Sequence, residues 1–348
     1  MEHLDVIGKA QDTLDTSVNQ MNLDLFLSDD DSPDITRSLR VYDLAPKYVY
    51  DNPAVLLANA KTSSVERELT IKNTIYKTVI TAGNIRDDDG LEYLAFPSAR
   101  EELVEIALRK LAVSGGAITT KNGGVGVQFS IYALRNELAA HGHAATYKDI
   151  KRSILILRRA SLTIMDTKTG KTWDENFFPQ MAIGGWEGAA GAEYQQHYVS
   201  FHSLVSESIR SLQFRDVNYR DLMMIKGSLA RYIFTRMASI YIYASSDDPY
   251  SPSRNQLLTE SGRRTEGAGN RLNEQVSRAL NQLVAQGIIE RWSVKRQEKT
   301  GRAVTNLFYE IFPTKRFISD IINANKSYAH RMKKLGKKRI AQIKGSIA

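Results

Sequence analysis

The residue types in this 348-residue chain that are best suited to a chemical task lie along one predicted helix, residues 270–286. Arg271, Gln275 and Arg278 recur on one face of it, and Asn270 stands at its N-terminal end. Arginine can donate two parallel hydrogen bonds to guanine O6 and N7, and Asn or Gln can pair similarly with adenine N6 and N7. These side chains are therefore candidates for contacting base edges in duplex DNA. The alternative is an ordinary amphipathic helix whose charged face meets only water.

Two pairs of cations flank this helix. Arg263 and Arg264 precede it in a loop, and Lys295 and Arg296 follow it at the end of a predicted strand. Residues 254–302 hold ten Lys/Arg against five Asp/Glu. Most protein–DNA hydrogen bonds go to phosphate and sugar, and basic side chains supply many of them. We therefore expect the first pair to hold phosphate near a turn and the second pair to do so from a hairpin.

Residues 253–312 contain the elements that would position these side chains. Ser253-x-x-Gln256 is a capping-box pattern, and Gly287 suits the position after a helix where φ is positive. The predicted elements are helix 253–261, helix 270–286, and strands 288–295 and 302–312 joined by a polar turn. The apolar stripe of the longer helix consists of Leu272, Val276, Leu280, Leu283 and Val284. This order of elements is typical of a winged helix-turn-helix.

A similar order occurs earlier in the chain. Ser98-x-x-Glu101 is a second capping-box pattern, and Thr146-x-x-Asp149 resembles one that opens a helix ending near Ala160. Two extended segments joined by a turn follow that helix, as in a wing. Its predicted buried positions are Ile150, Ile154 and Leu157, and its polar positions predicted to contact DNA are Tyr147, Lys148, Lys151 and Arg152.

These repeated patterns predict the domain organisation. We expect an α+β, helix-rich fold with two tandem winged-helix domains, the first over 67–185 and the second over 195–325. The Gly/Ala-rich segment 186–193 is the predicted loop between them. The alternating residues 197–209 predict a strand that enters the second domain.

Composition limits the classes of protein to which the chain can belong. It has no cysteine, which excludes disulfides and thiolate metal sites, and its six His residues are scattered. We predict no metal site and no cofactor. No long apolar run appears, so we expect no membrane insertion and a cytoplasmic location. The net charge of +8 favours a polyanionic partner.

The two ends of the chain carry opposite charges. Residues 1–36 hold nine Asp/Glu and one Lys, which predicts a disordered acidic arm. Residues 326–348 hold eight Lys/Arg and no acid, which predicts a basic tail that contacts phosphate or is simply solvated. One short apolar cluster interrupts the arm, and it consists of Asn22, Leu23, Asp24, Leu25 and Phe26. Its alternative role is a hydrophobic patch that folds back on the body.

Motifs that would indicate an enzyme are incomplete. Gly170-Lys171-Thr172 resembles the end of a phosphate loop, but Met165 stands where that loop needs its first glycine. His141-Gly142-His143 resembles the paired His of enzymes that nick DNA through a Tyr. Such a motif needs a bulky apolar residue between the two His to place both imidazoles on one side of a strand. We therefore predict binding without covalent chemistry.

With these features the chain resembles plasmid replication initiators of the TrfA type. The resemblance is carried by the Asp87–Asp89 turn leading into the predicted helix 98–113, by VGVQFSIYALRNEL (125–138), and by the two winged-helix patterns. The cluster Asn22–Phe26 also resembles the pentapeptide through which bacterial replication proteins bind the sliding clamp. That pentapeptide usually begins with Gln, and in this chain either Asn22 takes that place or Gln20 stands two positions early.

This resemblance implies a function and partners. It implies binding to directly repeated origin sequences (iterons), melting of adjacent AT-rich DNA, and engagement of the sliding clamp, the replicative helicase and the host initiator. It also implies a monomer–dimer balance, with dimerisation and backbone contacts in the first domain and base recognition in the second. Two alternatives stay open: a transcriptional repressor with the same domains, and a Tyr-dependent origin-nicking enzyme.

Overall fold

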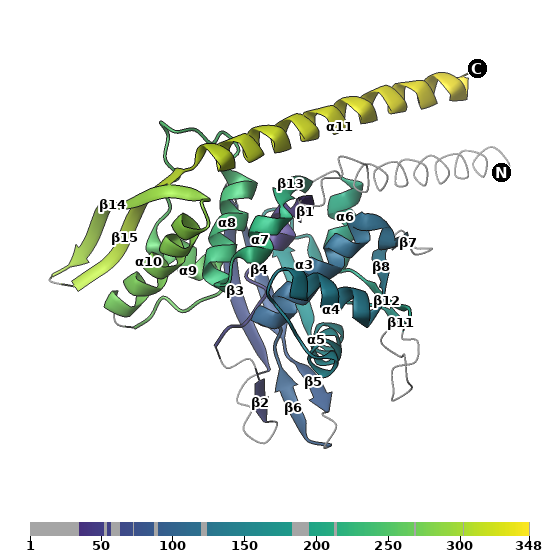
Figure 1. Ribbon diagram of the computed structural model, residues 1–348, viewed down its shortest axis with the longest axis horizontal. Helices are drawn as coiled ribbons and strands as arrows, with labels where there is room; N and C mark the ends of the chain where they lie inside the picture. Colours follow the sequence, from purple (N-terminus) through teal and green to yellow (C-terminus); the bar gives the residue numbers. More distant parts are fainter. Residues whose placement is uncertain are drawn as a thin grey trace.

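The computed structural model is a mixed α+β fold in which helices and small sheets alternate along the chain (Figure 1). Its described strands form five separate sheets, so the expectation of a helix-rich fold is wrong. The predictions for 22–26, 87–89 and 186–193 lie outside the described residues. The structure describes residues 35–51, 54–56, 63–71, 73–86, 90–119, 124–182, 195–211, 214–267, 269–301 and 303–347.

The strands pair antiparallel in every sheet. In hydrogen-bonding order the sheets are β1 (Ile35–Leu39) with β13 (Phe214–Asn218); β10 (Thr172–Asn176), β9 (Ser161–Asp166), β4 (Thr74–Thr81) and β3 (Ser64–Ile71); β11 (Met181–Ala182), β12 (His197–Ser200), β8 (Val125–Phe129) and β7 (Ala117–Thr119); β2 (Ala54–Leu56), β6 (Glu92–Ala95) and β5 (Gly83–Arg86); and β14 (Ile289–Thr300) with β15 (Ala303–Pro313).

The helices cover these sheets and connect them (Figure 1). They are α2 (Arg40–Leu44), α3 (Ala99–Leu111) with a π-type turn after it (Ala112–Gly116), α4 (Ile131–Ala140), α5 (Tyr147–Arg159), α6 (Ser203–Arg210), α7 (Tyr219–Met224), α8 (Ser228–Ile240), α9 (Arg254–Glu260), α10 (Gly269–Ala285) and α11 (Lys315–Ile347).

Two predicted capping boxes begin helices α3 and α5. Glu101 Oε2 accepts a hydrogen bond from the Ser98 backbone N–H at 2.9 Å, at the start of α3. Thr146 Oγ1 accepts from the Asp149 N–H at 3.1 Å, and Asp149 Oδ2 accepts from the Thr146 N–H at 3.2 Å. These bonds satisfy N–H groups that have no partner within the helix. The predicted buried stripe of α5 is also confirmed: Ile150, Ile154 and Leu157 are all buried.

The prediction of one strand over 197–209 is wrong in its second half. Only β12 is extended, and it pairs with β8 of the N-terminal part. His202 Nδ1 accepts from the Leu204 N–H at 3.1 Å and starts α6. Leu204, Val205 and Ile209 are buried from that helix. The apolar residues fit burial on one helix face as well as they fit strand alternation, and the local cap favours the helix.

Strand β1 connects the beginning of the described chain to a strand that lies almost 180 residues later. Ile35 and Thr36, which the sequence placed in the disordered arm, belong to β1 and pair with Asn218 and Val217 of β13. A single buried apolar cluster then extends from Leu39, at the end of β1, to residues of α11. The N-terminal and C-terminal parts therefore share one packed interior.

The element order predicted for residues 253–312 is confirmed. At Ser253 only half of the capping box forms, because Ser253 Oγ accepts from the Gln256 N–H while the Gln256 amide donates to Glu260. Gly287 follows α10 with φ of +64°, which a residue without Cβ adopts most easily. The hairpin is longer than expected, since β14 continues to Thr300 and the chain turns at Gly301.

The inner face of α10 differs from the prediction at one position. The residues buried from this helix are Leu272, Val276, Ala279, Leu280 and Leu283. Val284 is 37% exposed, so its place on the buried stripe is wrong. Ala279 and Leu283 are four residues apart and stand one above the other, whereas Val284 lies a further 100° around the helix, toward solvent.

The C-terminal end of the chain is helical. Helix α11 continues through the predicted basic tail and projects from the body (Figure 1). Near its start Phe317 and Ile321 are buried against the core. Within the described part of the chain, no helix is long and apolar enough to cross a membrane, and no group of three or more His, Asp or Glu is arranged to hold a metal ion.

Arg254 links α9 to α10 and β15. It is 2% exposed, and its guanidinium donates to Asn273 Oδ1 of α10 at 2.7 Å and to the Thr305 carbonyl of β15. Arg254→Ala should lower the free energy of unfolding by about 2–3 kcal/mol, because it leaves buried acceptors without donors. Urea denaturation of the full chain measures this. Arg264→Ala, an exposed control, should change stability by less than about 0.5 kcal/mol, and an equal effect of both changes would contradict the prediction.

Candidate nucleic-acid interface

An open groove of about 800 Å³ runs along the exposed face of α10. Three segments line it: the stretch after α2, the loop between α9 and α10, and α10 itself. The lining residues with charged or polar side chains are Tyr50, Asp51, Arg263, Arg264, Glu266, Arg271, Glu274, Gln275 and Arg278. Four arginines therefore face three carboxylates. This balance attracts a polyanion weakly overall and favours a ligand whose charges and hydrogen-bonding groups match the positions of these residues.

The predicted base-contacting residues are placed as expected on the outer face of α10. Asn270, Arg271, Gln275 and Arg278 are all exposed. Arg278 Nη2 lies 2.6 Å from Glu274 Oε1, with the Arg278 side chain 77% exposed. An ion pair this exposed contributes little to stability, so its arginine can exchange partners at small cost. The side chains are positioned to reach outward, and their assignment to bases stays a prediction.

The two arginines of the loop have different surroundings. Arg264 is exposed at the rim of the groove, whereas Arg263 folds inward. Its Nη2 donates to Ser228 Oγ at 2.5 Å, and its guanidinium lies 4.2 Å from the centre of the Tyr50 ring. Burial lowers the pKa of Arg263, and the nearby Tyr50 and Glu102 oppose that shift.

The hairpin β14–β15 stands beside α10 and exposes most of β14. Trp292 Nε1 donates to Asn281 Oδ1 of α10 at 2.9 Å, which holds the hairpin against the helix. Further along, Lys295 lies 3.1 Å from Glu310, and Arg296 stacks 3.9 Å from the centre of the Phe308 ring. The Lys295 and Arg296 side chains are 58% and 57% exposed. Both cations are therefore accessible, although they do not line the groove.

Helix α5 does not offer the same free face as α10. Tyr147 and Lys151 are half-buried, while Lys148 and Arg152 are exposed. Arg152 lies 5.1 Å from the centre of the Tyr93 ring of β6. The small sheet of β2, β6 and β5 packs against this helix, and Ile156 is buried with Ile85, Tyr93 and Ala95. These α5 residues are not among those that line the groove of α10.

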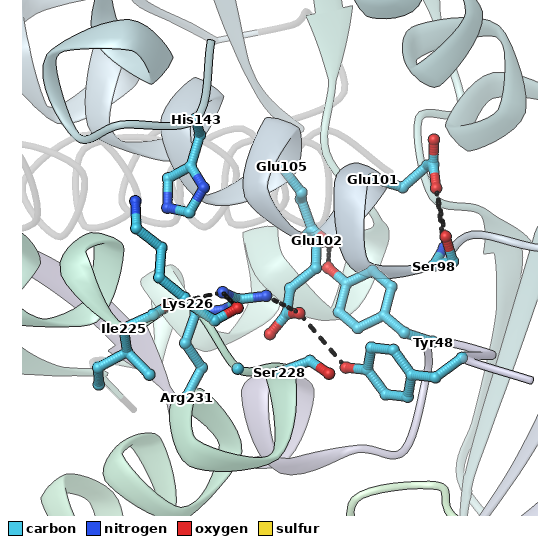
Figure 2. A network of polar contacts seen from close by, with 12 residues as sticks. Tyr48, Ser98, Glu101, Glu102, Glu105, His143, Ile225, Lys226, Ser228 and Arg231 are labelled. Atoms are coloured by element: carbon cyan, nitrogen blue, oxygen red, sulfur yellow. Dashed lines mark hydrogen bonds and ion pairs between the residues drawn. The ribbon is translucent and has the colours of Figure 1, made fainter. Parts of the chain in front are cut away.

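Sequence reasoning missed the residues that the N-terminal part adds to the groove. Tyr50 and Asp51 come from LAPKYVYDNP (44–53), a segment that carries no recognisable binding motif. Tyr50 contacts a buried polar network that includes Glu102 and Arg231, both labelled in Figure 2. The Tyr50 hydroxyl donates to Glu102 Oε2 at 3.4 Å, and Arg231 Nη2 donates to the same oxygen at 2.8 Å. No local pattern marks these contacts, because they join residues more than fifty positions apart.

The network continues from Glu102 along α3. Tyr48 donates a short hydrogen bond to Glu105, and Lys47 lies 3.5 Å from Glu105. Arg109 of the same helix lies 2.7 Å from Asp43. Burial raises the pKa of Tyr48, and the Glu105 charge adds to the shift, so its hydroxyl stays a donor. Opposite charges paired in this way can be buried together at moderate cost.

Comparison with known proteins yields loose structural matches. No protein-family model and no curated protein matches the chain. Among solved structures it is similar to a crystal structure of domains 2 and 3 of RctB, with a TM-score of 0.49 and 11% identity over 79% of this chain and 96% of that chain. A second RctB structure, of residues 155–483, has a TM-score of 0.44 and 13% identity over 78% of this chain and 98% of that one.

A third similar structure is the Pi initiator protein in complex with iteron DNA, with a TM-score of 0.44 and 13% identity over 62% of this chain and 91% of that chain. An initiator is the class of protein that the sequence resembles. At these scores and identities the agreement is in outline only, so the function has to rest on the contacts of this chain.

Proposed function

We propose that this protein binds duplex DNA through a winged helix-turn-helix formed by α9, α10 and the hairpin β14–β15. The observation that carries the proposal is the exposure of Asn270, Arg271, Gln275 and Arg278 together on one face of a helix whose other face is buried. An α-helix fits the major groove, and these residue types form hydrogen bonds with base edges. Arg264 at the loop and the exposed cations of the hairpin are then available for phosphates on either side.

The acidic residues of the groove give this binding its selectivity. Glu274 and Glu266 line the groove together with the arginines. Their charges repel the phosphates of DNA that is bound with its bases out of register with the arginines. In that arrangement Arg278 exchanges Glu274 for a base edge when the DNA sequence fits. The binding is therefore proposed to favour a particular sequence over DNA in general.

We further propose that the sites are repeated sequences of a replication origin. The order of elements in both parts of the chain supports this, as does the resemblance to initiators of the TrfA type. The N-terminal part would form a first winged-helix domain that contacts the DNA backbone and takes part in dimerisation. The protein would act with plasmid DNA in the bacterial cytoplasm and engage the replicative helicase and the host initiator.

The proposed action involves no covalent step. His141 Nδ1 contacts the Glu137 carbonyl at 3.0 Å, while His143 Nε2 contacts the Met223 carbonyl at 2.6 Å. Gly142 turns the chain between them with φ of +73°. These separate contacts support a structural role for the two His rather than a shared metal site in a nicking enzyme. Incubation with supercoiled origin DNA and Mg²⁺ should therefore give no covalent Tyr–DNA adduct.

Binding to an origin array can be tested directly. DNase footprinting on DNA next to the gene should show regularly repeated protected segments. A fragment carrying them should replicate in a host that supplies the protein, whereas a repressor would protect DNA without supporting replication. A single protected segment at a promoter, with no replication of the fragment, would favour the repressor alternative.

The contacts on α10 and on the hairpin should differ in a measurable way. Arg271→Ala or Arg278→Ala should cost about 1–3 kcal/mol on the protected sequence and relax preference at one base pair. Lys295→Ala should weaken binding to all sequences similarly and reduce the slope of log K against log salt by roughly 0.9. Fluorescence anisotropy with matched and scrambled duplexes measures both quantities. An equal loss on both duplexes for Arg271→Ala would reassign that residue to phosphate.

A contact with the sliding clamp is proposed for residues 22–26. An apolar cluster in an acidic arm can dock in an apolar pocket if the interaction offsets the ordering entropy. Leu25→Ala with Phe26→Ala should abolish capture of purified clamp and leave DNA affinity within about twofold, since the arm contributes no base contact in this proposal. Capture that persists in the double variant would rule out this segment as the clamp site.

A further inference from the structure

The loop arginine Arg263 is held in the groove without a carboxylate partner. Its hydrogen bonds go to Ser228 Oγ at 2.5 Å and to the Ser261 carbonyl at 3.3 Å, and its guanidinium carbon lies 4.2 Å from the centre of the Tyr50 ring. Within the described residues, no carboxylate oxygen lies within ion-pair distance of it. The hydrogen-bond partners of Arg263 are neutral, although the charges of Glu102 and Asp51 lie near enough to act on it. A guanidinium that forms no direct ion pair can form one with an anion that enters the groove.

Tyr50 belongs to the other part of the chain and is fixed from behind. Its hydroxyl donates to Glu102, and Glu102 is itself held by Arg231, which is 1% exposed. Arg231 also donates to the carbonyls of Ile225 at 2.7 Å and Lys226 at 3.2 Å, immediately before α8 (Figure 2). The Tyr50 ring, which contacts Arg263, is therefore linked through its hydroxyl to a buried charge pair.

A second contact holds the loop of Arg263 on the same segment. Arg67 Nη1 of β3 donates to the Tyr48 carbonyl at 2.6 Å and to the Pro46 carbonyl at 3.1 Å. Gly262 sits directly against that guanidinium: a Cβ there would lie 2.3 Å from Arg67 Nη1, and the Gly262 φ is +77°. The loop between α9 and α10 is thus seated on the N-terminal part by its backbone as well as by Arg263.

We propose that Arg263 is a phosphodiester-binding group of the groove and that Tyr50 is the positioning residue that holds it there. Under this proposal the N-terminal part completes a DNA-binding site that lies on the C-terminal part. The proposal rests on the proposed DNA-binding function and deepens it. A cation–π contact with an aromatic ring restricts the positions open to a guanidinium, which reduces the entropy lost when it binds a ligand.

A double-mutant cycle on DNA affinity tests this coupling. Arg263→Ala should weaken binding roughly tenfold on matched and scrambled duplexes alike and reduce the salt slope by about 0.9, as the loss of one phosphate contact requires. Tyr50→Leu should produce a similar loss. The double variant should be no weaker than Arg263→Ala alone, because Tyr50 acts only through Arg263. Tyr243→Leu, at a tyrosine that is 83% exposed, and Arg86→Ala are matched controls that should leave affinity unchanged.

The possible outcomes distinguish failure of this proposal from failure of the proposed DNA-binding function. Losses that multiply in the double variant, or an unchanged salt slope in Arg263→Ala, would overturn the coupling while wild-type binding stands. Failure of the wild-type chain to bind either duplex would instead overturn the proposed function. If thermal unfolding shows that Tyr50→Leu does not fold, Tyr50→Phe takes its place. It keeps the ring and loses the bond to Glu102, so a twofold to threefold loss that disappears in the Arg263→Ala background supports the proposal, and a loss that persists there overturns it.

Discussion

The buried ion pair between Arg231 and Glu102 is the constraint on which the arrangement of α8, α9 and α10 depends. The two residues are 1% and 8% exposed, and their nearest atoms are 2.8 Å apart. Charges removed from water this fully are tolerated only when they are paired and further hydrogen-bonded, and Arg231 meets that condition through the carbonyls before α8. A pair with such strict geometry accepts few alternative arrangements. It therefore fixes α8 relative to α3, and with α8 the elements that follow it.

Further contacts link α8 to α9 and α10. Helix α8 meets α10 through Gln282, whose side chain accepts from the Gly227 N–H at 2.9 Å, and it meets α9 through Arg236, which lies 2.6 Å from Glu260. Arg254 then ties α9 to α10 and β15. Each contact is a hydrogen bond made by a buried or half-buried polar group, so each costs desolvation if it is lost. These contacts, together with the buried apolar residues of α10, position the exposed face of that helix.

Local signals in the sequence predicted the elements well, and contacts between distant segments explain what they missed. The caps at Ser98 and Thr146 and the turn at Gly287 are decided within a few residues, so the element order was accessible from sequence. The helix after His202 was missed because apolar spacing over a short segment suits a strand equally well. Tyr50 was missed for a different reason: its position in the groove depends on Glu102 and the loop of Arg263, which lie far away along the chain.

The two predicted DNA-contacting helices are unequal in a way that bears on their roles. One side of α5 carries Ile156 into a cluster with Ile85 and Tyr93, under the small sheet of β2, β6 and β5. A helix covered in this way offers a smaller open face than α10 does. Its exposed Lys148 and Arg152 can still reach phosphates along the rim. The face of α10 away from the core is therefore open, whereas α5 is covered on one side by that sheet.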